Sequence, residues 1–340
     1  DVCSSDLVSA DSTSGTDGTV DIANILVAGG DIDVTGGTID LNGTSYDVDT
    51  TGAISLTGSV NLQSAGTITL ETEGDDDSSD EEDITITGTI DDPGNDSDLV
   101  VQGATGSVGD LLVTGAIGSG QPIGSLDVDG TMDDVELQGT ITTAGTAGGT
   151  VTLGSGGGLQ GTLTLGGDIT TTQATPAATD VAGAVSLDAA QIRIAKAVGG
   201  ATLSIVTDEP DGGAIDGAIT IDTQAGTLES ATAWEDGLEL DAGSGTMSIG
   251  TDFDVANLDH LIIDSGSAEL GDLVLGDGSG NGTQADTALL VTTATDLRLF
   301  GDISSTGDGD NAGIIDLDGV GGNIDLRDGG ATVAGTVTIT

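Results

Sequence analysis

Short steps of an apolar residue, a polar residue and a second apolar residue recur along nearly the whole chain. The segment GGDIDVTGGTIDLNG, residues 29–43, contains two of them, Ile32-Asp33-Val34 and Ile39-Asp40-Leu41. Side chains alternate between the faces of a strand, so the outer residues of each step point one way and the middle residue points the other. The middle residue is nearly always Asp, Glu, Ser, Thr, Asn or Arg, which predicts that it faces water.

Glycine and short spacing determine how these strands connect. A Gly pair or Gly-Thr usually precedes a step, as in GGTIDL and AGTITL, and neighbouring steps are often six to twelve residues apart. This spacing leaves no room for the crossover helix of a βαβ unit. It suits brief strands joined by corners where Gly, Asn or Asp adopts positive φ. We therefore predict an all-β fold, a right-handed parallel β-helix in which two or three strands form each coil.

Antiparallel hairpins are the alternative, and Asn42-Gly43 and Asp236-Gly237 match their turns, but most strands are too short for hairpins. Residues 187–198 fit a helix, but the alternation in Gln191-Ile192-Arg193-Ile194 fits a strand at least as well. A coil of about 22 residues gives about 15 coils spaced by ~4.8 Å, a rod roughly 70 Å long.

Several segments interrupt the pattern. The acidic run at 73–83 cannot bury anything and is expected to form a loop between coils, and Gly/Asp loops are expected at 276–286 and 306–313. All four prolines fall between steps, as their missing N–H requires. They are Pro93, Pro122, Pro176 and Pro210.

The first seven residues, DVCSSDL, match nothing later in the chain and contain its one cysteine, Cys3. They read as a translated sequencing adapter, with an ordinary strand lead-in as the alternative, so the biological sequence is expected to be a single solenoid over 8–340. The sequence stops inside a strand step at 335–340, without a polar cap. We therefore expect an uncapped metagenomic fragment of a longer protein.

Charge narrows the choice of partners. The 340 residues include 58 Asp+Glu and 4 Lys+Arg, a formal net charge of −54. Four basic residues cannot neutralise a phosphate backbone, so nucleic acid is excluded as a direct partner. No run of 18 apolar residues exists, so no membrane-spanning helix is expected.

Aromatic residues make up 1% of the chain, which predicts a narrow aliphatic core. Carboxylates stacked at ~4.8 Å repel by roughly 0.9 kcal/mol per pair in water, so salt is expected to stabilise the fold, as in salt-adapted proteins.

Stretches such as GAISLTGSVNLQSAGTITL and WEDGLELDAGSGTMSIGTDFDV make most of residues 20–340 resemble the repetitive body of filamentous-haemagglutinin-type exoproteins and large bacterial adhesins. The resemblance implies a right-handed parallel β-helix, secreted or displayed at the cell surface. The family's secretion domain and an aromatic-rich outer-membrane barrel are not found in the sequence.

Oxygen-rich loops indicate calcium, a hard cation, as the candidate metal. The candidate ligands are Asp308, Asp310, Asn311 and Asp277, although Ala312 occupies a ligand position and no Glu closes that loop. No cofactor is required, and the alternative is an acidic face that attracts cations loosely.

Candidate catalytic residues are few. Asp91-Asp92, His260 and the RIAK segment at 193–196 invite comparison with pectin hydrolases, but the order of His and basic motif is reversed. His260 is therefore expected to be a surface or strand-end residue and Trp234 a loop or capping ring. The sequence predicts a non-catalytic structural or adhesive segment, whose partners are cations, extracellular matrix, polysaccharide or other cells. A calcium-dependent carbohydrate-binding or polysaccharide-cleaving β-helix is the alternative.

Overall fold

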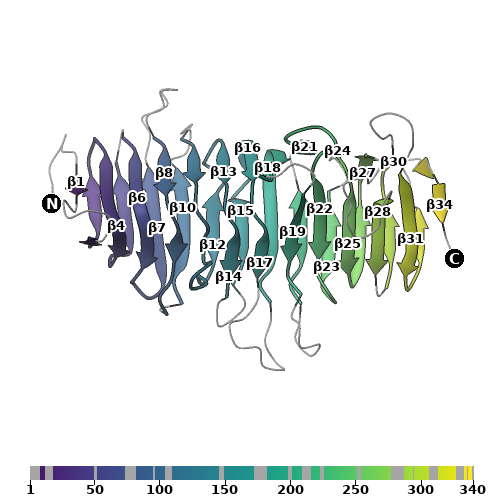
Figure 1. Ribbon diagram of the computed structural model, residues 1–340, viewed down its shortest axis with the longest axis horizontal. Coiled ribbons are helices and arrows are strands. Elements are labelled where there is room, and N and C mark those ends of the chain that lie inside the picture. Colours follow the sequence, from purple (N-terminus) through teal and green to yellow (C-terminus); the bar gives the residue numbers. More distant parts are fainter. Residues whose placement is uncertain are drawn as a thin grey trace.

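The chain forms an elongated stack of short strands in the computed structural model (Figure 1). The structure describes residues 8–11, 18–49, 52–72, 82–94, 96–103, 109–144, 149–171, 182–197, 201–208, 216–222, 226–250, 254–276, 287–293, 295–305, 313–326, 333–334 and 336–338. Every regular element within these ranges is a strand, so the all-β prediction is confirmed. The segment that also fitted a helix lies largely in strand β18 (Val185–Ile194).

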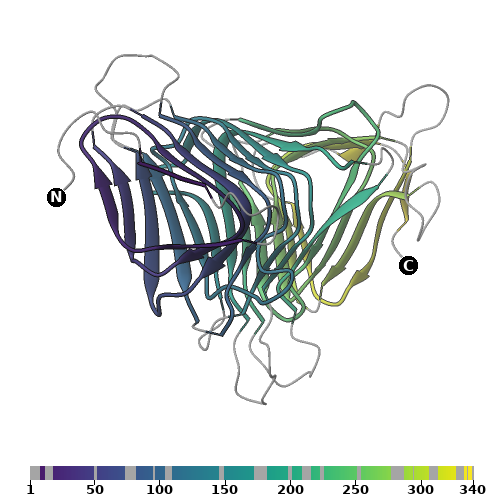
Figure 2. The same ribbon diagram turned by 60° about the vertical axis from the view of Figure 1, so that its left-hand side comes forward.

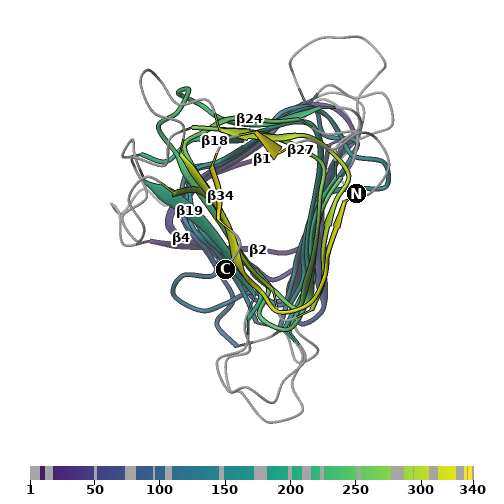
Figure 3. The same ribbon diagram turned by 90° about the vertical axis from the view of Figure 1, so that its right-hand side faces the viewer.

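Successive strands of one coil lie on three faces, and each strand pairs in parallel with the strand one coil further along. Viewed along the long axis, the strands outline a triangle (Figure 3). The turned view in Figure 2 shows the coils following one another along the stack. This arrangement is consistent with a parallel β-helix, and the parallel register excludes the hairpin alternative for the paired strands.

The strands divide among the faces as follows. The first face contains β1 (Val8–Asp11), the first halves of β4 (Ile32–Leu41) and β6 (Ile54–Leu62), β8 (Ile84–Thr87), β11 (Leu111–Val113), β13 (Val135–Leu137), the second halves of β16 (Leu159–Leu165) and β18, β21 (Thr227–Ser230), β24 (Asp254–Leu258), β27 (Asp272–Leu275), β30 (Ile303–Ser305) and β33 (Val333–Ala334). The second face contains β2 (Thr19–Ile22), the second halves of β4 and β6, β9 (Ile90–Asp91), β14 (Ile141–Thr143), β17 (Ile169–Thr171), β19 (Thr202–Val206), β22 (Gly237–Asp241), β25 (Leu261–Ser265), β28 (Thr287–Thr293), β31 (Ile314–Val320) and β34 (Thr336–Thr338). The third face contains β3 (Ile25–Val27), β5 (Ser45–Val48), β7 (Thr67–Thr72), β10 (Asp98–Gly103), β12 (Leu126–Asp129), β15 (Val151–Ser155), the first half of β18, β20 (Ile219–Asp222), β23 (Thr246–Ile249), β26 (Ser267–Leu270), β29 (Leu297–Leu299) and β32 (Ile324–Leu326).

The outer residues of the apolar steps fill the inside of the triangle, as predicted. Ile32 and Val34 are 1% and 0% exposed, while Asp33 between them faces solvent. Burial of each such aliphatic side chain contributes about 1.5–3 kcal/mol. Tyr46 is the one aromatic residue in the described core, and its hydroxyl donates to the carbonyl of Ile22 and accepts the N–H of Gly43.

A row of glycines forms the corner between the first and second faces. A Cβ at Gly58 would lie 2.0 Å from the carbonyl oxygen of Gly36, and one at Gly88 would lie equally close to that of Gly58. Both glycines have φ of 143°. The backbone of successive coils therefore stacks directly at this corner, which explains why glycine precedes so many steps.

The coils are longer than the sequence suggested. Successive first-face strands pair at offsets from 18 residues, Val255 to Leu273, up to 36 residues, Ile192 to Leu228. The twelve steps from Val8 to Val333 average about 27 residues, so the prediction of 22 residues and 15 coils is wrong. Insertions at the corners lengthen a coil without lengthening its strands.

Buried threonines hold the ends of three insertions together. The hydroxyls of Thr143, Thr171 and Thr207 donate to the carbonyls of Gly149, Gly183 and Gly217, at 2.5–2.8 Å. Each bond joins the end of a second-face strand to the residue that leads into the third face. The same stem therefore accepts insertions of different length.

The acidic run ends inside the coil rather than in solvent. Of residues 73–83, only Glu82 and Asp83 are described, and Glu82 is 2% exposed. Its carbonyl accepts the hydroxyl of buried Thr72. The expectation that nothing in this run is buried is therefore wrong for Glu82, because the backbone must already approach the corner there. Pro93 and Pro122 lie between strands, while Pro176 and Pro210 lie outside the described residues.

Candidate functional site

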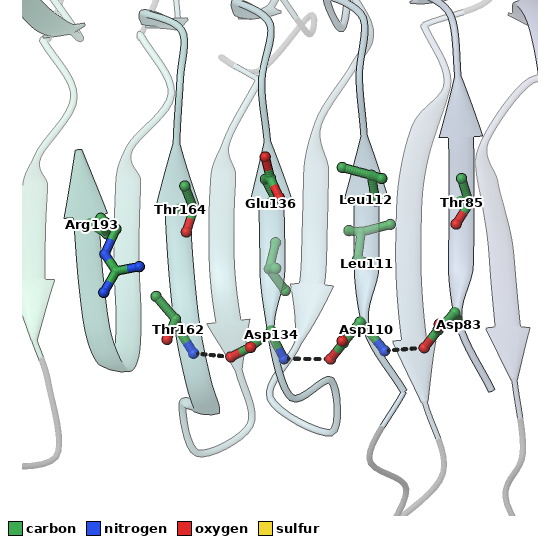
Figure 4. A pocket seen from close by; sticks show the side chains of 11 residues that line it. Asp83, Thr85, Asp110, Leu111, Leu112, Asp134, Glu136, Thr162, Thr164 and Arg193 are labelled. Atoms are coloured by element: carbon green, nitrogen blue, oxygen red, sulfur yellow. Dashed lines mark hydrogen bonds between the residues drawn. The ribbon is translucent and has the colours of Figure 1, made fainter. Parts of the chain in front are cut away.

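A ladder of aspartates lies at the corner that leads into the first face. Asp83 Oδ1 accepts the N–H of Asp110, Asp110 Oδ1 accepts that of Asp134, and Asp134 Oδ1 accepts that of Thr162. The three bonds measure 3.0, 3.0 and 2.5 Å, and Figure 4 shows them as one continuous row. Each aspartate thus satisfies a backbone donor of the next coil. We call Asp83, Asp110 and Asp134 the aspartate ladder.

The ladder borders a shallow groove of about 410 Å³ on the outer side of the first face. Thr85, Leu112, Glu136, Thr164 and Arg193 form its floor, each from a successive coil (Figure 4). Burial raises the pKa of Asp110, the N–H of Asp134 opposes this shift, and the charges of Asp83 and Asp134 add to it. Burial and the charge of Asp134 likewise raise the pKa of Asp133.

Other corners use the same device. Asp91 accepts the N–H groups of Gly120 and Gln121, Asp216 accepts that of Ser244, and Asp296 accepts that of Asn323. The backbone and side-chain donors of Asn323 lower the pKa of Asp296. Sequence reasoning assigned the acids to the solvated middle of each step and missed this second role. An Asp directly before an apolar step, as in Asp83-Ile84, is the signal that would have predicted it.

Each described basic side chain pairs with an acid of a neighbouring coil. Arg193 lies 3.4 Å from Glu229, Lys196 2.7 Å from Asp168, and Arg298 2.5 Å from Glu269. Exposed pairs contribute at most about 1 kcal/mol, which applies to Arg298 and Glu269, whereas the Lys196 side chain is only 15% exposed.

The chain's one histidine lies in a different kind of corner, between the first and second faces near β22 and β25. Thr202 pairs in register with Gly237, and the pairing of Leu238 with Leu261 places His260 opposite Gly237. A Cβ at Gly237 would lie 2.1 Å from Cε1 and Nε2 of His260. The imidazole therefore occupies the space that this glycine leaves and reaches across one coil to Thr202.

Two hydrogen bonds hold the imidazole. The Thr202 hydroxyl lies 2.9 Å from Nε2, and Asp259 Oδ2 lies 2.8 Å from Nδ1. With Nδ1–H donating to the carboxylate, Nε2 is left to accept the threonine proton. Both His260 and Asp259 are 1% exposed, whereas Thr202 is partly exposed. The result is a hydroxyl–imidazole–carboxylate relay.

A further buried acid and two residues with positive φ lie close to this relay in the chain. Asp236 is 3% exposed, and burial raises its pKa, opposed by bonds from the Ser230 hydroxyl and the N–H of Lys196. Trp234, the chain's one tryptophan, donates its backbone N–H to the carbonyl of Asn257, and both residues have positive φ, 64° and 61°. Backbone strain of this kind costs of order 1–3 kcal/mol per residue. We call residues 230–237 and 257–260, with Thr202, the histidine corner.

The structure corrects or limits several predictions about the site. The sequence predicted His260 to be a surface or strand-end residue. It does lie at the end of a strand, but it is buried, so the prediction of a surface position is wrong. The reason is the space over Gly237, which the sequence pattern did not reveal. Asp91 and His260 lie six coils apart, roughly 29 Å at the spacing of strands, so the pectin-hydrolase grouping does not assemble.

The four predicted calcium ligands, Asp277, Asp308, Asp310 and Asn311, lie outside the described residues. Among the residues that are described, no three His, Cys, Asp or Glu side chains are grouped so as to hold a metal ion. No helix long and apolar enough to cross a membrane occurs in the same part of the chain.

Comparison with protein families, with curated proteins and with solved structures finds no match for this chain.

Proposed function

We propose that this chain is a structural or adhesive segment of a secreted or cell-surface bacterial protein, a right-handed β-helix of the filamentous-haemagglutinin type. The observation that carries the proposal is the repetition of one acid-based device along the stack, shown by the aspartate ladder and its counterparts at Asp91, Asp216 and Asp296. A repeated device builds length and a uniform acidic surface rather than a single reaction centre.

The proposal predicts binding to surfaces by charge. We expect the purified chain to bind to a cationic polysaccharide film such as chitosan but not to neutral dextran. The bound chain should dissociate in high salt. Surface plasmon resonance would measure both. Adhesion that is equal on the two films, or independent of salt, would contradict an electrostatic adhesive surface.

A calcium-dependent carbohydrate-binding or polysaccharide-cleaving β-helix is the second candidate. The groove along the aspartate ladder favours the carbohydrate-binding part of this candidate, because it aligns carboxylates at the spacing of the coils. The described residues contain no group of metal ligands, so any calcium would bind outside them. Calorimetric titration of calcium with a defined stoichiometry, together with release of reducing ends from an acidic polysaccharide, would support this candidate over the first. Weak binding without saturation would reject it.

A further inference from the structure

The histidine corner brings together features that are rare in the rest of the described chain. It contains the one histidine, the one tryptophan, two of the three described non-glycine residues at positive φ, and two of the described buried acids, Asp236 and Asp259. Strained and buried polar groups that gather at one place indicate a local function.

We propose that Thr202 is a nucleophile for acyl transfer, with His260 as its general base and Asp259 as the residue that positions the imidazole. A hydroxyl within hydrogen-bond reach of an imidazole, which a third group orients in turn, is the arrangement that activates a weak nucleophile. Here the two distances are 2.9 and 2.8 Å. Thr202 comes from β19 and the other two residues directly precede β25, so only the folded stack brings them together.

The exposure of the three residues fits their separate roles. Thr202 is partly exposed on the outer side of the second face, while His260 and Asp259 are closed off from water. Gly237 is required because any side chain there would collide with the imidazole. A base shielded in this way keeps its orientation between turnovers.

The reaction follows from these positions. Thr202 Oγ1 attacks the carbonyl carbon of an ester and forms a new C–O bond, while its proton passes to His260 Nε2. The tetrahedral intermediate then expels the alcohol, which takes the proton from Nε2, and leaves an acyl group on Thr202. Water attacks this ester with the same base, releasing the acid and restoring the hydroxyl.

The local charges indicate the substrate class. Ser204 lies on the same outer side of β19, bonded through its N–H to Asp168 and through its hydroxyl to Glu239. Carboxylates so near would repel an anionic ester. We therefore assign an ester without negative charge as the substrate class.

The test uses the full chain and p-nitrophenyl acetate. The expected result is a burst of about one equivalent of nitrophenolate per chain, with an acetyl group mapped to Thr202 by peptide mass spectrometry. Thr202→Ala should abolish the burst, and His260→Ala should slow acylation by about 10²–10⁴-fold. Asp259→Asn should slow acylation, while the final amount of acyl group bound per chain stays the same.

Ser204→Ala provides the matched control, because Ser204 lies two residues further along the same strand, faces the same side, and bonds to Glu239 instead of an imidazole. It should keep the full burst. If a variant fails to fold, the acetyl map of the unmodified sequence decides by itself. An acetyl group on other residues, or none on Thr202, would overturn the proposal and leave the relay as a bond between coils; the adhesive function would stand in either case.

Discussion

The aspartate ladder and the histidine corner connect neighbouring coils in opposite ways. The ladder repeats one exposed contact from coil to coil, with each carboxylate accepting one backbone N–H. The histidine corner makes its contacts once, keeps the imidazole of His260 and the carboxylate of Asp259 buried, and spans two coil spacings from Thr202 to His260. A contact that repeats can tolerate loss at one position, whereas a contact made once cannot.

The dependence of stability on salt should distinguish the acidic outer surface from the histidine corner most clearly. Like-charged side chains face each other on adjacent coils at Asp21 and Asp40, Asp47 and Glu71, and Asp241 and Asp264. Each pair costs roughly 0.9 kcal/mol in water, and the longer-range part of the repulsion is screened by salt. We expect the melting temperature to rise with NaCl by the same amount in the unmodified chain and in His260→Ala. A melting temperature that ignores salt would contradict the acidic-surface account.

Among these single substitutions, Gly237→Ala is expected to lower the free energy of unfolding most. The added methyl group would overlap the held imidazole and cost about 1–3 kcal/mol of unfolding free energy. Denaturant unfolding would measure it, and combination with His260→Ala should cost less than the sum of the two. Gly250→Ala is the control, because the nearest atom there is the movable Oδ1 of Asp222. Equal losses at the two glycines would show that the imidazole does not fill the space over Gly237.

Asp134→Ala should cost less, about 1 kcal/mol, because it leaves the Thr162 N–H without its carboxylate. Glu136 lies two residues further on, is exposed, and accepts a bond only from Gln138 among the described contacts. Glu136→Ala should therefore change the free energy of unfolding by no more than about 0.5 kcal/mol. Chemical denaturation of both variants would check the difference. No difference between them would mean that the ladder adds no stability.

Asp222→Asn should have the smallest effect and the opposite sign. Burial, and then the charge of Asp222, raise the pKa of Asp188 above its ordinary value of 3.8. The folded chain therefore binds more protons than the unfolded chain between the two pKa values, so stability falls as the pH rises through this window. Removing the facing charge should stabilise the chain by about 0.2–1 kcal/mol at pH 7, and this gain should vanish below the window. Urea unfolding of both chains at several pH values would measure this gain. A gain that persists in acid would contradict the role given to the charge of Asp222.

The sequence predicted the strands well because each is specified by its own neighbours. The alternation in Ile32-Asp33-Val34 or Gln191-Ile192-Arg193-Ile194 needs no distant partner to be recognised. Coil length was predicted badly because it depends on how many residues separate one strand from the next, as between Thr171 and Gly183, and the strand pattern does not specify that number. The sequence singled out His260 and Trp234, but the contact of His260 with Thr202 could not be predicted, since these two residues are 58 residues apart and meet only through the register of three coils.

The parallel register itself is tested most directly by a designed disulfide. Thr85 and Leu112 face outward at paired positions on adjacent coils, whereas Glu136 lies one coil further on. In a Cys3→Ser background, cysteines at 85 and 112 should oxidise to a disulfide, because the ~4.8 Å spacing of strands lies within the Cα range of such bonds. Cysteines at 85 and 136, roughly 9.6 Å apart, should stay reduced. Oxidation of the second pair in place of the first would contradict the stacked-coil account.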